Sequence, residues 1–178
     1  MAITTLEREV TEQDSYRPLG ISSDVNLTDE QFDSLSRLER FEAPYVEEKL
    51  LKDGKLVRED YQEAFTEFKR YVALVNLNKG RGAMSMSSKE VDEVWHQFIL
   101  FTPQYHEFCD EVLGRYLHHV PTTSQTPSTP TGKANFIRNY TNAFGEIPEI
   151  WNINLGSDPC DAGNCVNPPE DCTPCSND

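Results

Sequence analysis

All four histidines of the chain, and one of its five cysteines, lie in a single segment, VDEVWHQFILFTPQYHEFCDEVLGRYLHHVP (Val91–Pro121). Imidazole nitrogens and cysteine thiolates are the usual protein ligands of zinc and similar divalent metals. Because residues of these types gather in one short segment, we expect a metal site there. The candidate ligands are His96, His106, Cys109, His118 and His119.

Two further residues of this segment, Asp92 and Tyr105, are expected to support the ligands of such a site without binding the metal themselves. Asp92 and His96 are four residues apart, so on a helix their side chains are neighbours. A carboxylate commonly holds the second ring nitrogen of a metal-binding histidine, and Asp92 is placed for that role. The same residues also allow an enzyme, in which His96 is a general base or metal ligand, Asp92 orients it and nearby Tyr105 donates a proton.

A role without a metal stays open for the same residues. Cys109 and His106 could form a thiolate–imidazolium pair, but helical periodicity turns Cys109 toward the core, where cysteine usually acts as a small hydrophobic residue. His118 and His119 follow a helix, where histidine can simply favour the negative end of the helix dipole. The histidines would then only help to pack the core of a metal-free protein-interaction module.

A second group of cysteines lies near the end of the chain, in the segment CDAGNCVNPPEDCTPC. Four thiolates at this spacing could hold one tetrahedral zinc or a soft metal such as copper(I). In an oxidising compartment they would form two disulfides instead, and a disordered tail with unliganded thiols is a third possibility. The residues of this separate tail site are Cys160, Cys165, Cys172 and Cys175.

The charge of the chain limits its partners. Thirty Asp and Glu residues against 16 Lys and Arg give a net charge of −14, which disfavours nonspecific binding to nucleic acid or to an anionic membrane. It favours cations or a protein partner with a basic surface. The sequence has neither a targeting segment nor a run of apolar residues long enough to span a membrane. We therefore expect a cytoplasmic protein. We also expect no nucleotide cofactor.

Helical spacing of apolar residues accounts for the first part of the chain. Thr28 is placed to cap a helix, and Gln31 completes a capping box. Pro44 can start a short second helix that Gly54 ends. Residues 57–78 form the longest amphipathic run and predict a third helix.

The histidine-bearing segment predicts two more helices. The first opens at Ser87, with Glu90 at the position of a capping box, and has an apolar stripe that includes Trp95. Thr102 and Pro103 interrupt it and start the next helix, which ends at Gly114. The two helices form a hairpin that would fold the candidate ligands toward one another.

A sixth helix is predicted over residues 133–144, and Ile150 and Trp151 can close the core behind it. With no period-two alternation, the fold class is all-α, a single bundle of about six helices. Residues 1–26 are expected to be a flexible, disordered arm or a strap over the core. The helical domain spans 27–155 and contains a linker at 121–132, and residues 156–178 form the acidic, Cys-rich tail.

The motifs VDEVWHQFIL, YHEFC and LHHVP, followed by FGEIPEIW, resemble the glycine-rich domain-containing protein-like family over roughly residues 60–151. This resemblance implies a largely uncharacterised function. It implies that His106 is variable, and it narrows the metal ligands to His96, Cys109, and His118 or His119. The positions it assigns to the family signature are Asp92, Trp95, His96, Tyr105, Cys109, His118 and His119.

Overall fold

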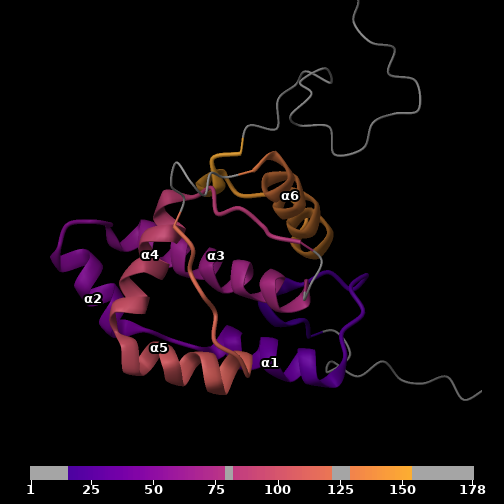
Figure 1. The fold of residues 1–178 in the computed structure, drawn as a ribbon, viewed down its shortest axis with the longest axis horizontal. Coiled ribbons are helices and arrows are strands. Elements are labelled where there is room, and N and C mark those ends of the chain that lie inside the picture. Colours follow the sequence, from indigo (N-terminus) through magenta and orange to yellow (C-terminus); the bar gives the residue numbers. More distant parts are fainter. Residues whose placement is uncertain (1–15, 79–81, 122–128, 154–178) are drawn as a thin grey trace, which may run out of the picture.

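The computed structural model describes residues 16–78, 82–121 and 129–153, which fold into α-helices and short helical turns without a strand (Figure 1). This confirms the all-α prediction, while the Cys-rich tail lies outside the described residues. No helix within the described residues combines the length and apolar character needed to cross a membrane. The elements are η2 (Pro18–Gly20), α1 (Asp29–Arg40), α2 (Pro44–Lys52), α3 (Arg58–Leu77), α4 (Lys89–Leu100), α5 (Thr102–Phe108), η3 (Cys109–Leu113), α6 (Pro130–Phe144) and η4 (Glu149–Trp151).

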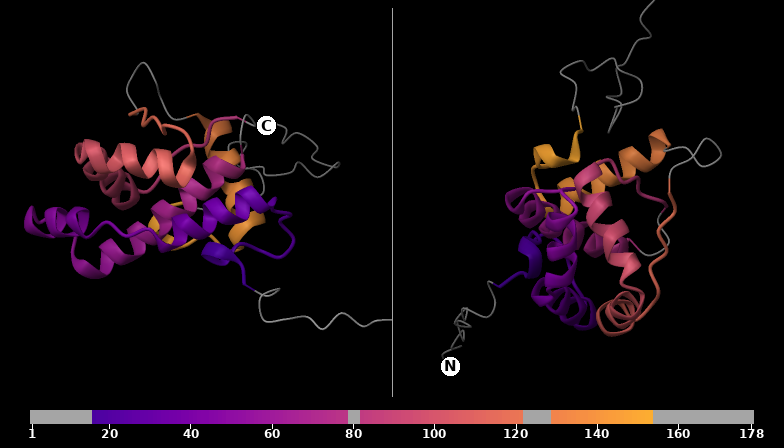
Figure 2. Two further views of the ribbon diagram at one scale, coloured as in Figure 1. Left: turned by 90° about the horizontal axis from the view of Figure 1, so that it is seen from below. Right: turned by 90° about the vertical axis from the view of Figure 1, so that its left-hand side faces the viewer.

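Helix α3 lies at the centre and packs against α1, α2, α4 and α6 (Figures 1 and 2). Its Phe68 is fully buried and lies near the rings of Phe98 and Phe108, which come from α4 and α5. Trp151 of η4 is also fully buried and packs on Phe136 of α6. The predicted closure of the core by Trp151 is therefore confirmed.

Local capping sets the start of two helices. At α1 the predicted capping box is present: Thr28 Oγ1 accepts from the Gln31 backbone, and the Gln31 side chain accepts from the Thr28 backbone. At α4 the cap is Ser88, whose hydroxyl accepts from the Val91 backbone at 3.2 Å. The prediction of Ser87 with Glu90 was therefore wrong by one residue. Either serine can cap a helix, and the observed start buries Val91 completely.

The fifth helix changes character before it ends. Residues Cys109–Leu113 adopt a π-helical turn, and Gly114 stops it with a φ of 65°. The backbone N–H of Arg115 closes the turn by donating to the Cys109 carbonyl at 3.2 Å. A wider turn of this kind often marks a functional region. Here it precedes the return segment, residues 115–121, which runs back alongside α4 (Figures 1 and 2).

A buried polar cluster joins α3 to the C-terminal elements. The carboxylate of Glu67, 2% exposed, accepts from Arg70, from the hydroxyl of Tyr140 and from Nε1 of Trp151. The buried negative charge of Glu67 is therefore paired with Arg70, and both carboxylate oxygens accept hydrogen bonds. Burial of a charge is costly without such partners. Arg70 also donates to the carbonyl of Leu19 and so ties η2 to the same cluster.

The N-terminal part of the described chain, residues 16–28, lies against the helices. Ile21 is 1% exposed, and the backbone N–H of Ser22 donates to the Ala143 carbonyl at 2.7 Å. Of the two expectations for this stretch, a strap over the core fits and a flexible arm does not, because apolar burial and backbone hydrogen bonds hold it against the helices. The earlier part of the expected arm, residues 1–15, lies outside the described residues.

Helix α6 begins at Pro130, three residues before the predicted start, because Thr129 caps it by accepting from the Gly132 backbone at 3.0 Å. The segment before α4 is hydrogen-bonded to this first turn: the backbone N–H of Ser85 donates to the Gly132 carbonyl. A Cβ on Gly132 would lie 2.4 Å from Ser85 Oγ, so glycine permits this close approach. The contact forms one wall of the cleft described next.

Candidate metal centre

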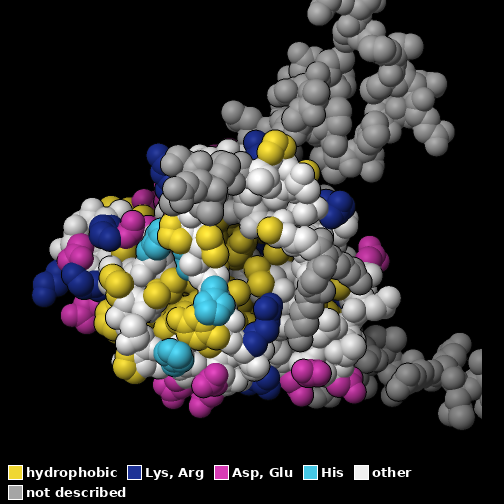
Figure 3. All heavy atoms as spheres, in the orientation of Figure 1, with side chains coloured by type: hydrophobic (Ala, Val, Ile, Leu, Met, Phe, Trp, Pro, Cys, Tyr) yellow, Lys and Arg dark blue, Asp and Glu magenta, His cyan; other side chains and the backbone are white. Residues whose placement is uncertain are grey.

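A cleft of about 810 Å³ opens between α3, α4, the start of α6 and the two segments that precede α4 and follow α5. Figure 3 shows this face, where His side chains and a basic side chain border a hollow with a hydrophobic floor. Its volume falls within the range of small-molecule sites. The lining includes Tyr71, Val75, Met84, Met86, Asp92, Trp95, His96, Arg115, Leu117, His118, His119 and Val120.

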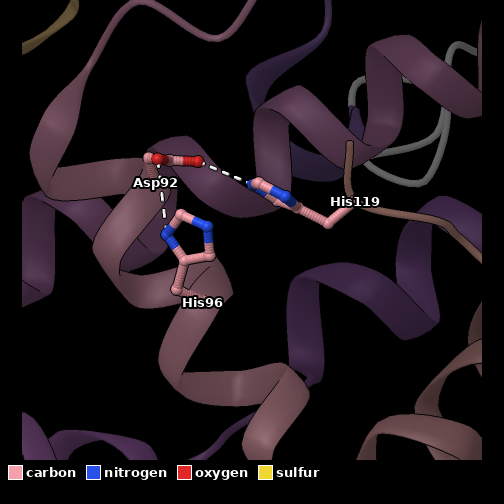
Figure 4. Close-up of side chains that lie close together, drawn as sticks. All are labelled: Asp92, His96 and His119. Carbon is pink, nitrogen blue, oxygen red and sulfur yellow. Dashed lines mark hydrogen bonds and ion pairs between the residues drawn. The ribbon is translucent and has the colours of Figure 1, made fainter. Parts of the chain in front are cut away.

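Three side chains that could bind a metal meet on the wall of the cleft (Figure 4). Asp92 and His96 lie one turn apart on α4, and His119 comes from the segment after η3. One carboxylate oxygen of Asp92 is 2.7 Å from Nε2 of His119, and the other is 3.4 Å from Nδ1 of His96. The two imidazole rings are 4.3 Å apart, centre to centre.

Tyr105 and Trp95 hold His119 in this place. The buried Tyr105 hydroxyl accepts from Nε1 of Trp95 at 3.0 Å and donates to the carbonyl of Leu117 at 2.5 Å. Burial raises the pKa of Tyr105 above its ordinary value, which keeps the hydroxyl protonated as a donor. The edge of the His119 ring also packs on Trp95 with centroids 4.5 Å apart. Tyr105 thus positions the chain two residues before His119.

Cys109 lies apart from this group. Its side chain is fully buried at the junction of α5 and η3, and the ligand cluster found in the described residues does not include it. Burial raises the pKa of the Cys109 thiol, an effect that hydrogen bonding with the Leu117 backbone and the Tyr105 hydroxyl offsets in part. A buried, protonated thiol is a poor metal ligand and a poor nucleophile.

The other two histidines, His106 and His118, both pack against the ring of Tyr116. The His106 ring lies 4.9 Å from the ring of Tyr116, and His118 lies 4.7 Å from it on an edge. His118 reaches the lining of the cleft but not the cluster, whereas His119 is hydrogen-bonded to Asp92. Of the two adjacent histidines, the structure brings His119 to Asp92 and His96.

Tyr71 and Arg115 are among the cleft residues that were not singled out from the sequence. Tyr71 of α3 donates to the Met84 carbonyl at 3.0 Å, and burial, with a smaller contribution from the charge of Asp92, raises its pKa to about 12. Arg115 follows the Gly114 stop and reaches the cleft from the start of the return segment. Tyr71 belongs to the apolar face of α3, so no sequence pattern separates it from core residues. Arg115 is the one basic residue between the helix stop and the histidine pair, which is a usable signal.

A family model for UCP032817-like proteins matches residues 34–144, from within α1 to the end of α6. The chain belongs to the UCP032817-like family. No curated protein and no solved structure matches the chain. The resemblance to the glycine-rich domain-containing protein-like family is therefore wrong: the matching family is an uncharacterised one, and no glycine-rich domain family matches.

The motifs behind that resemblance have a structural role in this fold. Trp95 and Tyr105 join the helical hairpin to the return segment through the buried Tyr105 hydroxyl. In this UCP032817-like chain, the matched region contains every described residue that lines the cleft.

The cluster has the donor types of an open metal site. Two imidazoles and one carboxylate are found at catalytic zinc centres and at non-haem iron centres, both of which leave coordination positions free. The potential ligand atoms of Asp92, His96 and His119 all lie within 4.8 Å of one another. Tetrahedral zinc requires ligand atoms about 3.3 Å apart, a small adjustment for side chains that are 33%, 44% and 9% exposed, respectively. The residues present therefore fit a divalent metal.

The tail cysteines Cys160, Cys165, Cys172 and Cys175 lie outside the described residues. Their metal-bound, disulfide-bonded and unliganded states all stay predictions from the sequence.

Proposed function

We propose that this protein is a small helical module that binds a divalent metal, zinc in the first instance, through Asp92, His96 and His119. The observation that carries the proposal is the carboxylate of Asp92 placed between two imidazoles at the wall of a cleft. Three protein ligands leave at least one coordination position free, and that position would face the cleft. The module would then present the metal to a ligand from solution.

The charge of the molecule supports the same proposal. A net charge of −14 raises the local concentration of cations around the chain. It also favours a protein partner with a basic surface, which we propose as the second kind of ligand. We propose that the protein works in the cytoplasm, where reducing conditions keep its cysteines as free thiols.

Catalysis at the same residues is a second candidate function. The hydrogen bond between Asp92 and Nε2 of His119 orients the imidazole and leaves Nδ1 available to accept a proton. A carboxylate–imidazole pair at a cleft wall is an arrangement used by general bases. In such an enzyme His119 would be the base, in place of His96 as predicted from the sequence.

Zinc titration by calorimetry tests the metal proposal, provided that the tail cysteines do not contribute. The starting protein is therefore the full chain with Cys160, Cys165, Cys172 and Cys175 all replaced by serine. In this background we expect one zinc per chain. His96→Ala and His119→Ala should each weaken zinc binding at least about tenfold, because loss of a direct ligand costs no less than loss of a residue that only supports a ligand.

His106→Ala is the matched control, because it removes an exposed imidazole of the same hairpin that lies outside the cluster. It should leave zinc affinity unchanged. Circular dichroism of every variant verifies that helix content is retained. The proposal fails if His96→Ala and His119→Ala bind zinc as tightly as His106→Ala does.

A further inference from the structure

The cleft differs in charge from the rest of this acidic molecule. Among the described residues that line it, Asp92 is the acidic one and Arg115 the basic one. Asp92 is engaged by the two imidazoles of the cluster and would be neutralised by a bound metal. The cleft would then carry positive charge in a chain whose net charge is −14.

Arg115 is exposed, and one hydrogen bond ties its guanidinium to the wall of this cleft. Gly114 turns the chain with a φ of 65°, and the Arg115 guanidinium donates through Nη2 to the carbonyl of Val75 at 3.1 Å. Val75 lines the same cleft from α3. A guanidinium has five N–H donors, so donors remain for the oxygens of an anion. The hydrogen bond to Val75 restricts the side chain and so lowers part of the entropic cost of binding such a group.

The rest of the wall is suited to an apolar body. Met84 and Met86 line the cleft from the segment before α4, and Trp95 and Leu117 line it from α4 and the return segment. Both methionines are partly buried and pack against the core, and methionine adapts its shape to irregular apolar ligands. Figure 3 shows the basic and His side chains at the border of this hydrophobic hollow.

We infer that the cleft binds a small organic anion, with its charged group at Arg115 and its apolar body along the methionine wall. The inference rests on the proposed metal site, since the metal adds positive charge to the same cleft and cancels the charge of Asp92. A carboxylate and a phosphate monoester both satisfy this chemistry, because each presents two or more oxygens to a guanidinium.

The probes are hexanoate, hexyl phosphate and hexanol, titrated with and without zinc into the same full chain with its four tail cysteines replaced by serine, and followed by calorimetry. We expect the zinc-loaded protein to bind hexanoate or hexyl phosphate, the tighter of which identifies the anion class. Hexanol has the same apolar body without the charge and should bind at least about tenfold more weakly, the usual magnitude of a charge-assisted hydrogen bond.

Two pairs of variants locate the site. Arg115→Gln should weaken binding of the anion about tenfold or more, whereas Arg138→Gln, which removes an exposed arginine outside the cleft, should not. Val120 is 72% exposed and lines the cleft, so Val120→Glu adds a repelling charge without disturbing the core. Val120→Glu should bind the anion more weakly than Val120→Gln does. This pair tests the site even if Arg115→Gln does not fold.

The outcomes separate the inference from the proposed metal site. Zinc binding without any anion binding would overturn the inference and leave the metal site intact. Anion binding of equal affinity with and without zinc would support Arg115 as the anion-binding residue and would exclude a contribution of the metal to anion affinity. Equal binding of hexanol and hexanoate, or equal affinities of the two Val120 variants, would overturn the inference outright.

Discussion

The carboxylate of Asp92 lies 2.7 Å from Nε2 of His119, although 27 residues separate them in the sequence. This contact joins the first turn of α4 to the segment that returns from η3. A carboxylate oxygen can only accept a hydrogen bond, so Nε2 of His119 is the donor in this contact. It also brings His119 next to His96, which lies one helical turn after Asp92 on α4.

Replacement of Asp92 with asparagine keeps the shape and removes the charge. We expect Asp92→Asn to lower zinc affinity at least about tenfold, because the amide is a weaker ligand than the carboxylate. Stability should change by less than about 0.5 kcal/mol, since the side chain is one-third exposed and its oxygen can still accept from His119. Glu93→Gln is the control, because Glu93 is adjacent, pairs with Lys55 and lies outside the cluster. Equal zinc affinity in the two variants would exclude Asp92 as a ligand.

The Glu67 cluster predicts a large loss of stability on truncation. Glu67→Ala leaves Arg70, Tyr140 and Trp151 without their shared buried acceptor. We expect a loss of about 3–5 kcal/mol in the free energy of unfolding, measured by urea denaturation. Glu63→Ala, at an exposed position one turn earlier on α3, should change it by less than about 0.5 kcal/mol. A small effect at Glu67 would show that the cluster is not needed to hold α6 and η4.

The start of α4 can be tested with two adjacent serines. Ser88→Ala removes the hydroxyl that accepts from the Val91 backbone and should cost about 1 kcal/mol in thermal or urea unfolding. Ser87→Ala should be close to neutral, because Ser87 lies outside the helix cap. The opposite order would restore the boundary predicted from the sequence.

Alkaline pH should destabilise the fold through its buried tyrosines. Burial raises the pKa of Tyr61, Tyr71, Tyr105 and Tyr140 above the ordinary value of about 10, to about 12 for Tyr71. Stability is therefore complete below pH 10 and decreases as pH rises further, because the unfolded chain releases protons that the folded chain retains. Each such tyrosine contributes a slope of about 1.4 kcal/mol per pH unit in this range.

Tyr71→Phe isolates one of these contributions. Between pH 9 and 11.5, the free energy of unfolding measured in urea should decrease less steeply with pH for this variant than for the unmodified protein. The difference in slope should approach about 1.4 kcal/mol per pH unit, the contribution of one proton. Absorbance at alkaline pH gives an independent measure, since the buried phenols should ionise only as the protein unfolds. Parallel slopes in the two proteins would mean that Tyr71 ionises in the folded state as readily as in the unfolded one.

The helices were predictable because their signals are local. Apolar residues at helical spacing placed α3, and the pair Thr28 and Gln31 placed the start of α1, since a cap and its partner are only three residues apart. The errors were also local ambiguities. Ser87 and Ser88 are equally good caps by sequence. Thr129 and Pro130 belong to a segment with the composition of a linker, and the contact of Gly132 with Ser85 that accompanies the helix start there is not visible in the sequence.

The sequence by itself determined that the molecule is helical, that Cys109 faces inward, and that Asp92 and His96 share one edge of α4. It did not determine which of His118 and His119 joins them. That choice depends on the hydrogen bond from Tyr105 to the Leu117 carbonyl and on the contact of Trp95 with His119. These contacts connect residues that are distant in sequence and form only when the return segment packs on α4, so the tertiary structure alone selects His119.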